Sequence, residues 1–226
     1  MSHHRAAAAH KQGLYADELV AVDGKLEENG IKADTSMEKV SKLPPAFIKP
    51  HGTHTAANSS FLTDGAAAVL LMSEEKALQL GYKPKSILRT WTYVGVDPFE
   101  ELLLGPTFAT KKVLDSLGLT LKDIGVIEFH EAFAGQVLAN LNAMASETFA
   151  KDRLGGKVIG RFDSNKMNTL GGSLSLGHPF GATGARLVTT ASNRLQRENQ
   201  RFALLAACAD GGLAHGCILE RYDNKQ

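Results

Sequence analysis

Hydrophobic and polar positions form alternating blocks along most of this chain. Short apolar runs rich in β-branched and aromatic residues are typical of buried strands. They occur at 87–96, 124–129, 202–207 and 217–222. Apolar residues at helical spacing predict helices instead. These lie at 74–80, 110–117, 137–149 and 182–197. The alternation of strands and helices from about 86 to 222 predicts an α/β layered domain whose sheet is covered by helices on both faces.

The earlier part of the chain has weaker patterns. Its alanine-rich start predicts a helix over 5–16, followed by a short extended piece at 18–22. Residues 23–42 are polar and lack sustained periodicity, so we expect a loop there. The apolar run 66–72 suits either a strand or a helix.

Composition narrows the class of function. The 25 basic and 24 acidic residues leave a formal net charge of +1 without a run of like charge, which argues against binding of nucleic acid or of a membrane surface. No apolar stretch reaches the roughly 18 residues that a transmembrane helix needs. The two cysteines, Cys208 and Cys217, are too few for a disulfide framework and suit a reducing compartment.

Three nucleophilic or basic side chains are expected at junctions between strands and loops. His130 and Cys208 each follow a predicted strand, and His178 precedes the last predicted helix. Functional groups of α/β folds gather at such strand ends. Five glycines between 171 and 184 surround His178, and glycine lets a backbone approach a ligand closely. Each residue taken singly also suits a structural role, because cysteine is often buried and a turn often carries a surface histidine.

Several sequence motifs have a recognisable order and spacing: EFHEAFA at 128–134, GHPFGATG at 177–184 and CADGG at 208–212. Together they resemble the carboxy-terminal half of thiolases. The stretch 55–67 is similar to the coenzyme A-side serine loop of that family and the helix after it. Most thiolases have asparagine at the position of His130; the histidine resembles the branch that contains the β subunit of the mitochondrial trifunctional protein and its bacterial counterpart.

The resemblance implies an α/β, thiolase-like layered α-β-α fold with a complete C-terminal half and a partial N-terminal half. The expected division is a remainder of the N-terminal thiolase half, with part of the loop region, at 1–85 and the C-terminal thiolase domain at 86–226. Thiolases form their acyl-enzyme on a further cysteine in the N-terminal half. Cys208 matches the acid/base position instead, and Cys217 lies in a terminal strand with no motif around it, so we expect a fragment of a longer protein, and the helix-like start favours this.

The implied activity is that of an acyltransferase, a 3-ketoacyl-CoA thiolase (acetyl-CoA C-acyltransferase) of fatty-acid β-oxidation. Coenzyme A is a substrate, and no cofactor is expected. By resemblance, His178 activates the acylation cysteine and forms an oxyanion hole with His130. Cys208 acts as acid and base, because a thiol pKa can be tuned towards neutral. The backbone N–H of Asp210 belongs to a second oxyanion hole.

The resemblance also implies a substrate channel. Ser60 contacts the pantetheine arm of coenzyme A, and Ala132 and Phe133 line the channel. The family usually has a small residue at the position of Asp210 and a glycine at that of Ala214. An aspartate beside the developing enolate would repel it unless the side chain points to solvent.

The partners that the resemblance implies are acyl-CoA, CoA, a second copy in a homodimer, and a hydratase/dehydrogenase α subunit. No nucleic acid is expected, and membrane association would come through the complex. The implied location is mitochondrial, or cytoplasmic if the source is bacterial.

Two alternatives are open at this point. A non-catalytic thiolase-like interaction module would dock through the face that the other half covers in a whole thiolase. A metal site could use His130, His178, Cys208 and His215, but these residues lack CxxC or HExxH spacing, so no metal is expected.

Overall fold

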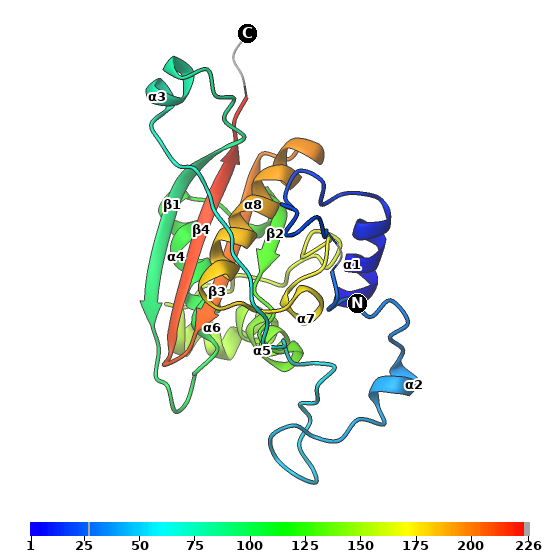
Figure 1. Ribbon diagram of the computed structural model, residues 1–226. Helices are drawn as coiled ribbons and strands as arrows, with labels where there is room; N and C mark the ends of the chain where they lie inside the picture. Colours follow the sequence, from blue (N-terminus) through cyan, green and yellow to red (C-terminus); the bar gives the residue numbers. More distant parts are fainter. Residues whose placement is uncertain (27, 224–226) are drawn as a thin grey trace.

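The computed structural model of this chain describes residues 1–26 and 28–223. Its centre is a four-stranded sheet in the order β1-β4-β3-β2 (Figure 1). The strands are β1 (Ser86–Gly95), β2 (Ile124–Phe129), β3 (Phe202–Ala209) and β4 (Leu213–Arg221). Strand β4 runs antiparallel to β1 and β3, whereas β2 and β3 are parallel. All four predicted strands are therefore present.

The helices are α1 (Ser2–Lys11), α2 (Met37–Val40), α3 (Glu74–Gln79), α4 (Gly105–Leu117), α5 (Ala134–Ala145), α6 (Glu147–Arg153), α7 (Ser173–Leu176) and α8 (Gly181–Arg197). A 3-10 turn at Leu121–Asp123 precedes β2. The single helix predicted at 137–149 is two helices, because the Ser146 side chain accepts a hydrogen bond from Phe149 N and starts α6 there. Helix α4 ends at Gly118, whose left-handed φ of 63° favours glycine.

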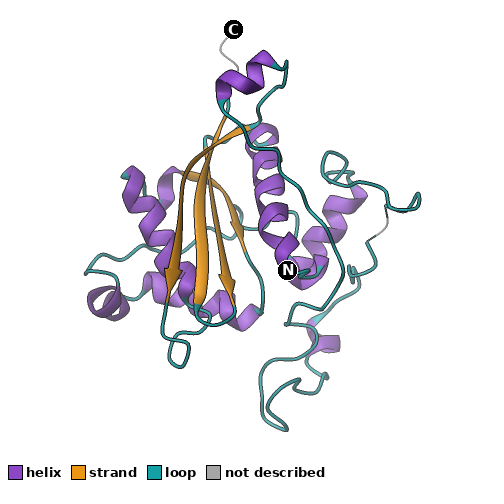
Figure 2. Ribbon diagram, turned by 60° about the vertical axis from the view of Figure 1, so that its left-hand side comes forward, coloured by secondary structure: helices purple, strands orange, loops and turns teal. Residues whose placement is uncertain are grey.

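Helices cover both faces of the sheet, as predicted (Figures 1 and 2). On one face, Val113 of α4 and Leu141 of α5 pack in a core layer with Leu204 of β3. On the other face, Leu187 of α8 packs in a second layer with Leu205 of β3. Adjacent strand residues point to opposite faces, so β3 serves both layers and is buried on both sides. The layered α-β-α prediction is confirmed.

The N-terminal part departs most from the sequence-based predictions. The first helix covers residues 2–11 rather than 5–16, and the extended piece expected at 18–22 is no strand, only an isolated bridge between Val22 and Lys25. The loop expected at 23–42 contains α2, which Ser36 caps.

The run 66–72 is neither strand nor helix, and the helix expected after the serine loop is missing there too. In the described part of the chain no strand pairs with this run, and a strand needs a partner for its backbone groups. The segment crosses the molecule as an extended connection before α3 (Figure 1).

Among the described residues, no helix combines the length and the apolar character needed to cross a membrane.

Candidate active site

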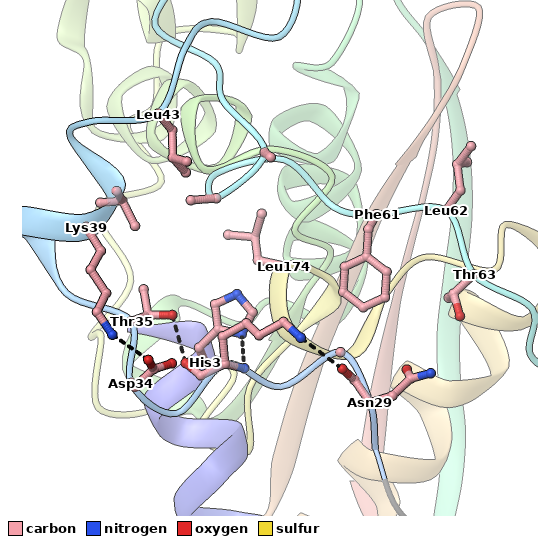
Figure 3. Close-up of a pocket in the computed structure, with 15 residues that line it drawn as sticks. His3, Asn29, Asp34, Thr35, Lys39, Leu43, Phe61, Leu62, Thr63 and Leu174 are labelled. Atoms are coloured by element: carbon pink, nitrogen blue, oxygen red, sulfur yellow. Dashed lines mark hydrogen bonds and ion pairs between the residues drawn. The ribbon is translucent and has the colours of Figure 1, made fainter.

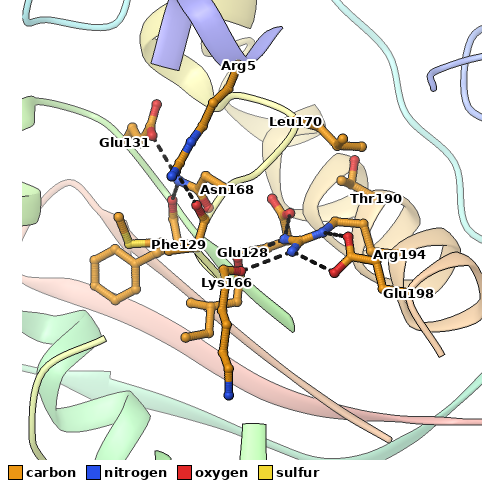
Figure 4. Close-up of polar contacts among 12 residues, drawn as sticks. Arg5, Glu128, Phe129, Glu131, Lys166, Asn168, Leu170, Thr190, Arg194 and Glu198 are labelled. Atoms are coloured by element: carbon orange, nitrogen blue, oxygen red, sulfur yellow. Dashed lines mark hydrogen bonds and ion pairs between the residues drawn. The ribbon is translucent and has the colours of Figure 1, made fainter. Parts of the chain in front are cut away.

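The backbone at the end of β2 holds His130 in a fixed place. His130 N donates to Ala206 O of β3 at 2.9 Å, which extends the parallel pairing one residue past β2. On the other side, the amide of Asn168 bonds both backbone groups of Phe129: Oδ1 accepts from its N–H at 2.8 Å, and Nδ2 donates to its oxygen at 2.7 Å. The backbone of 166–168 pairs with Ile127, and the Asn168 side chain continues this pairing to Phe129 (Figure 4).

Glu131 ties the loop after β2 to two helices. Its buried carboxylate accepts hydrogen bonds from Ser2 Oγ at 2.7 Å, from Asn168 Nδ2 at 2.9 Å and from Leu174 N at 3.4 Å. Ser2 begins α1, and Leu174 lies in α7. Sequence reasoning missed Glu131 and Asn168 as supports of the site. Their positions in the sequence were the only indication of such a role. Glu131 lies inside the EFHEAFA motif, and Asn168 lies in the turn before Gly171. Asn168 has a positive φ of 45°, which asparagine tolerates better than most residues.

A glycine turn places His178 at the start of α8. Gly177 has φ 87°, and a Cβ there would lie 2.4 Å from Thr63 Cγ2, so the turn requires glycine. His178 N donates to Phe61 O at 3.2 Å, and its Nδ1 lies 2.7 Å from the hydroxyl of Thr183 in the first turn of α8. The backbone of His178 is therefore held by Phe61, and its ring is oriented by Thr183.

The two histidines are in contact. Their ring centroids are 4.3 Å apart, with the planes tilted by 50°. Burial, followed by the nearby His178 and Arg186, lowers the pKa of His130 to about 3. Burial and then Arg186 also lower the pKa of half-buried His178. Both imidazoles are thus neutral at pH 7, a state in which each ring has one donor and one acceptor nitrogen.

The segment around Ser60 joins both histidine loops. Ser60 N donates to Ala132 O at 2.8 Å, and Ala134 N donates to Asn58 O at 2.9 Å, so the two segments pair antiparallel. The Phe133 ring meets the ring of His54 edge-on, with centroids 5.4 Å apart. The structure therefore brings together the three residues expected to bind substrate.

Cys208 lies at the same end of the sheet. It is two residues past Ala206, the partner of Phe129 in the parallel ladder. Burial raises the pKa of the Cys208 thiol to about 11, so the group is protonated at neutral pH. Within the described residues, no hydrogen bond or ring contact links Cys208 to either histidine. The thiol lies at the site but is not paired with an imidazole.

Asp210 and Cys217 lie apart from this chemistry. Asp210 is exposed in the β3–β4 turn, and its Oδ1 accepts from Gly211 N at 2.9 Å. Its carboxylate is thus directed to the solvent-exposed turn. Cys217 is buried inside β4 between Leu205 and Trp91, and burial raises the pKa of its thiol to about 12. A protonated thiol within a strand is a packing residue.

A cavity of about 680 Å³ lies between the N-terminal segments and the stretch that contains Phe61, Leu62 and Thr63 (Figure 3). His3 of α1, Lys39 of α2, Phe61 and Leu174 are among its lining residues, whereas His130, His178 and Cys208 are not.

Over residues 1–26 and 28–223, no group of three His, Cys, Asp or Glu side chains could hold a metal ion. The His215 ring instead lies 4.9 Å from the ring of Tyr93.

Comparison with known proteins gives consistent results. The family described as "Thiolase, C-terminal domain" matches residues 82–221, and "Thiolase, N-terminal domain" matches residues 1–75. The mitochondrial trifunctional enzyme subunit beta of Bos taurus is 56% identical over 98% of this chain and 47% of its own length. A 3-ketoacyl-CoA thiolase of Yersinia enterocolitica is 48% identical over 97% of this chain and 52% of its own length.

A solved structure adds the same fold. The human mitochondrial 3-ketoacyl-CoA thiolase in complex with CoA superposes with a TM-score of 0.80 and 30% identity, over 98% of this chain and 52% of the human one. The chain spans about half the length of the curated relatives it matches. Because the matched domains cover nearly all of the sequence and the layered fold agrees, the chain belongs to the thiolase family.

Proposed function

We propose that this chain is part of a 3-ketoacyl-CoA thiolase, which cleaves a 3-ketoacyl-CoA with coenzyme A to acetyl-CoA and a shortened acyl-CoA. One observation carries the proposal: two neutral histidines, His130 and His178, lie in contact at the end of the sheet where Cys208 also lies. The names of the bovine and bacterial relatives support the same activity.

In the proposed reaction, a cysteine thiolate from outside this chain attacks the 3-keto carbon of the substrate. The bond between C2 and C3 then breaks, and its electron pair passes into the enolate of acetyl-CoA. Cys208 gives its proton to the enolate carbon and becomes a thiolate. That thiolate takes the thiol proton of incoming coenzyme A, which attacks the acyl-enzyme and frees the first cysteine.

The properties of the side chains support these roles. The raised pKa of Cys208 keeps its thiol protonated, as an acid that reacts first must be. A neutral imidazole of His178 or His130 can donate one N–H to the thioester oxygen, where negative charge develops. We assign the backbone N–H of Asp210 to the second oxyanion hole, because its side chain is directed away into the exposed turn.

Ser60, Ala132 and Phe133 are proposed to contact coenzyme A. Their support is the direct pairing of the Ser60 segment with the loop after β2, which places them beside His130. We also propose the division into an N-terminal part at 1–85 and a C-terminal domain at 86–226.

Location and partners follow the relatives in this proposal. The bovine relative is a mitochondrial subunit beta of the trifunctional enzyme, so we propose a mitochondrial homodimer in a complex with a hydratase/dehydrogenase α subunit. The bacterial relative supports a cytoplasmic equivalent for a bacterial source.

The test is thiolysis of a 3-ketoacyl-CoA by this chain alone and by this chain joined behind the first half of the bovine relative. We expect turnover only from the joined protein. Cys208→Ala should lower its kcat by at least about 100-fold, the usual contribution of a positioned acid. Cys217→Ala is the matched control and should keep the activity. A folded joined protein without turnover, or one indifferent to Cys208→Ala, would overturn the proposal.

A second candidate is a non-catalytic interaction module. It is favoured by the exposed apolar side chains of Val69, Leu70 and Leu71, which lie next to one another. A cooperative melt of a monomeric 226-residue chain, together with an inactive joined protein, would favour this candidate over the enzyme.

A further inference from the structure

A buried serine lies between His130 and an arginine of α8. Ser173 is 0% exposed, and its Oγ lies 3.0 Å from His130 Nδ1. Arg186 Nη2 donates to the same oxygen at 3.2 Å. These two groups are the side-chain partners of the Ser173 hydroxyl in the described part of the chain.

The hydrogen-bonding capacity of the three groups determines where the protons lie. A guanidinium only donates, so Arg186 takes one lone pair of Ser173 Oγ. The hydroxyl has one proton, and a buried hydroxyl proton without an acceptor is costly. Within residues 1–26 and 28–223, His130 Nδ1 is the only side-chain acceptor for this proton, and the ring is neutral. If Nδ1 carried the proton, the Ser173 O–H would be left unpaired.

We infer that Arg186 and Ser173 are positioning residues that hold His130 as the tautomer protonated on Nε2. That nitrogen is buried and has no hydrogen-bond partner among the described residues. Its N–H is therefore a donor without an acceptor, which suits an incoming carbonyl or oxyanion. This use of the N–H rests on the proposed thiolase function, whereas the tautomer is a property of the folded chain.

The charge of Arg186 has a second effect in the same cluster. Its Nη1 is also buried and has no hydrogen-bond partner in the part of the chain that the structure describes, so the cluster contains two unpaired donor groups. Burial, the nearby His178 and the positive charge of Arg186, in that order, disfavour a second proton on His130, so the ring is neutral. Hydrogen-bond donors without acceptors beside a neutral ring favour a ligand whose oxygen accepts hydrogen bonds and gains negative charge during the reaction.

His178 provides a useful contrast. Its Nδ1 lies 2.7 Å from the Thr183 hydroxyl, but among the described residues no arginine donates to that hydroxyl. Thr183 can therefore either donate or accept, and His178 can exchange tautomers. The two rings therefore differ in one hydrogen bond: Arg186 donates to the partner hydroxyl of His130, and in the described part of the chain no arginine does so for His178.

The test is 15N NMR of the histidine ring nitrogens in the 226-residue chain. For the wild type we expect His130 protonated on Nε2 and unprotonated on Nδ1. Arg186→Met frees the Ser173 lone pair, so the ratio of tautomers should move by about tenfold towards Nδ1–H, the effect of one hydrogen bond. Arg197→Met, an exposed position on the same helix, should leave the ratio unchanged.

Protonated Nδ1 in the wild type, or a ratio unchanged by Arg186→Met, would overturn the inference. Should the variant fail to fold, the wild-type spectrum alone decides the tautomer. In the joined thiolase, Arg186→Met should lower kcat more than it changes KM. If the wild-type tautomer is as inferred and the joined protein is inactive, the proposed function fails and the tautomer stands.

Discussion

At the scale of single residues, burial rather than identity distinguishes the histidines. The chain has eight histidines, and the side chain itself is chemically the same at each position. His130 differs because it is 1% exposed and in contact with the His178 ring, and its pKa is lowered by burial first and then by the charges of His178 and Arg186. Burial likewise raises the pKa of Cys208, so the proposed acid is protonated and the proposed donor is neutral at the same pH.

This burial of His130 predicts an acid-dependent loss of stability. The folded pKa of about 3 lies below the unfolded value of 6.5, so the unfolded chain binds more protons between these pH values. The stabilising effect is complete above the unfolded pKa and is lost as pH falls towards 3. Between pH 7 and pH 5, His130 should account for about 2 kcal/mol of lost unfolding free energy.

Urea unfolding at the two pH values measures this loss. In His130→Gln the loss should be smaller by that amount. The remaining slope comes in part from His3, His178 and His215, whose pKa values burial also lowers. Exposed His51→Gln serves as the control. An equal loss in wild type and His130→Gln would contradict the prediction.

At the scale of elements, α8 is fastened to β2 by a buried ion pair. Arg194 Nη1 donates to Glu128 Oε1 at 2.7 Å, and both side chains are 0% exposed (Figure 4). Arg194 also donates to the backbone oxygens of Ile127 and Lys166. Burial alone would lower the pKa of Arg194, but Glu128 and Glu198 raise it, so the guanidinium is charged.

Removing one partner of this pair should be strongly destabilising. Arg194→Met leaves the Glu128 carboxylate buried without its cation, and the expected cost is about 3–5 kcal/mol of unfolding free energy. Lys39→Met is the control, because the Lys39–Asp34 pair is exposed to solvent and should contribute little to the free energy of unfolding. Chemical denaturation measures both, and equal small effects would show that the buried pair is not needed for stability.

The turn before α8 gives a second prediction for this element. Gly177→Ala combines a positive φ with a Cβ that would collide with Thr63, whereas Gly211 has φ 78° but nothing within 4 Å of its Cβ. Gly211→Ala should therefore cost about 1 kcal/mol from backbone strain alone. Gly177→Ala should cost at least about 2 kcal/mol. Thermal melts compare the two, and equal costs would mean that the turn can shift away from Thr63.

At the scale of the whole molecule, the long connection from Ser60 to α3 leaves apolar side chains in solvent. Leu70 and Leu71 are 68% and 69% exposed and belong to the run that forms neither strand nor helix. Contiguous exposed apolar surface promotes contacts between molecules. The 226-residue chain is therefore expected to self-associate as its concentration rises.

Light scattering coupled to size exclusion tests this expectation. The double variant Leu70→Ser, Leu71→Ser should shift the chain towards monomer. Leu138→Ser, at a 53% exposed position on α5, should not. A wild-type chain that stays monomeric at every concentration would contradict the prediction, as would a control that dissociates equally.

The local pattern of residues was enough to predict all four strands, the helices around them and the layered fold. The apolar run 202–207 forms a strand, β3, because neighbouring strands pair with it. Apolar residues at helical spacing form α8. The motifs around His130, His178 and Cys208 also indicated which side chains belong to the candidate site. These properties depend on residues close together in the chain, so they can be read from its order.

Only the tertiary structure decided how distant groups meet. The contact of His130 with His178, the Asn168 amide on the Phe129 backbone, and the Ser173 hydroxyl between ring and guanidinium join separate segments. The run 66–72 suited either a strand or a helix, but it has no partner strand in the described chain and stays extended and unpaired. Burial, pKa and hydrogen-bond partners depend on which segments cross in space, and residue order alone does not contain them.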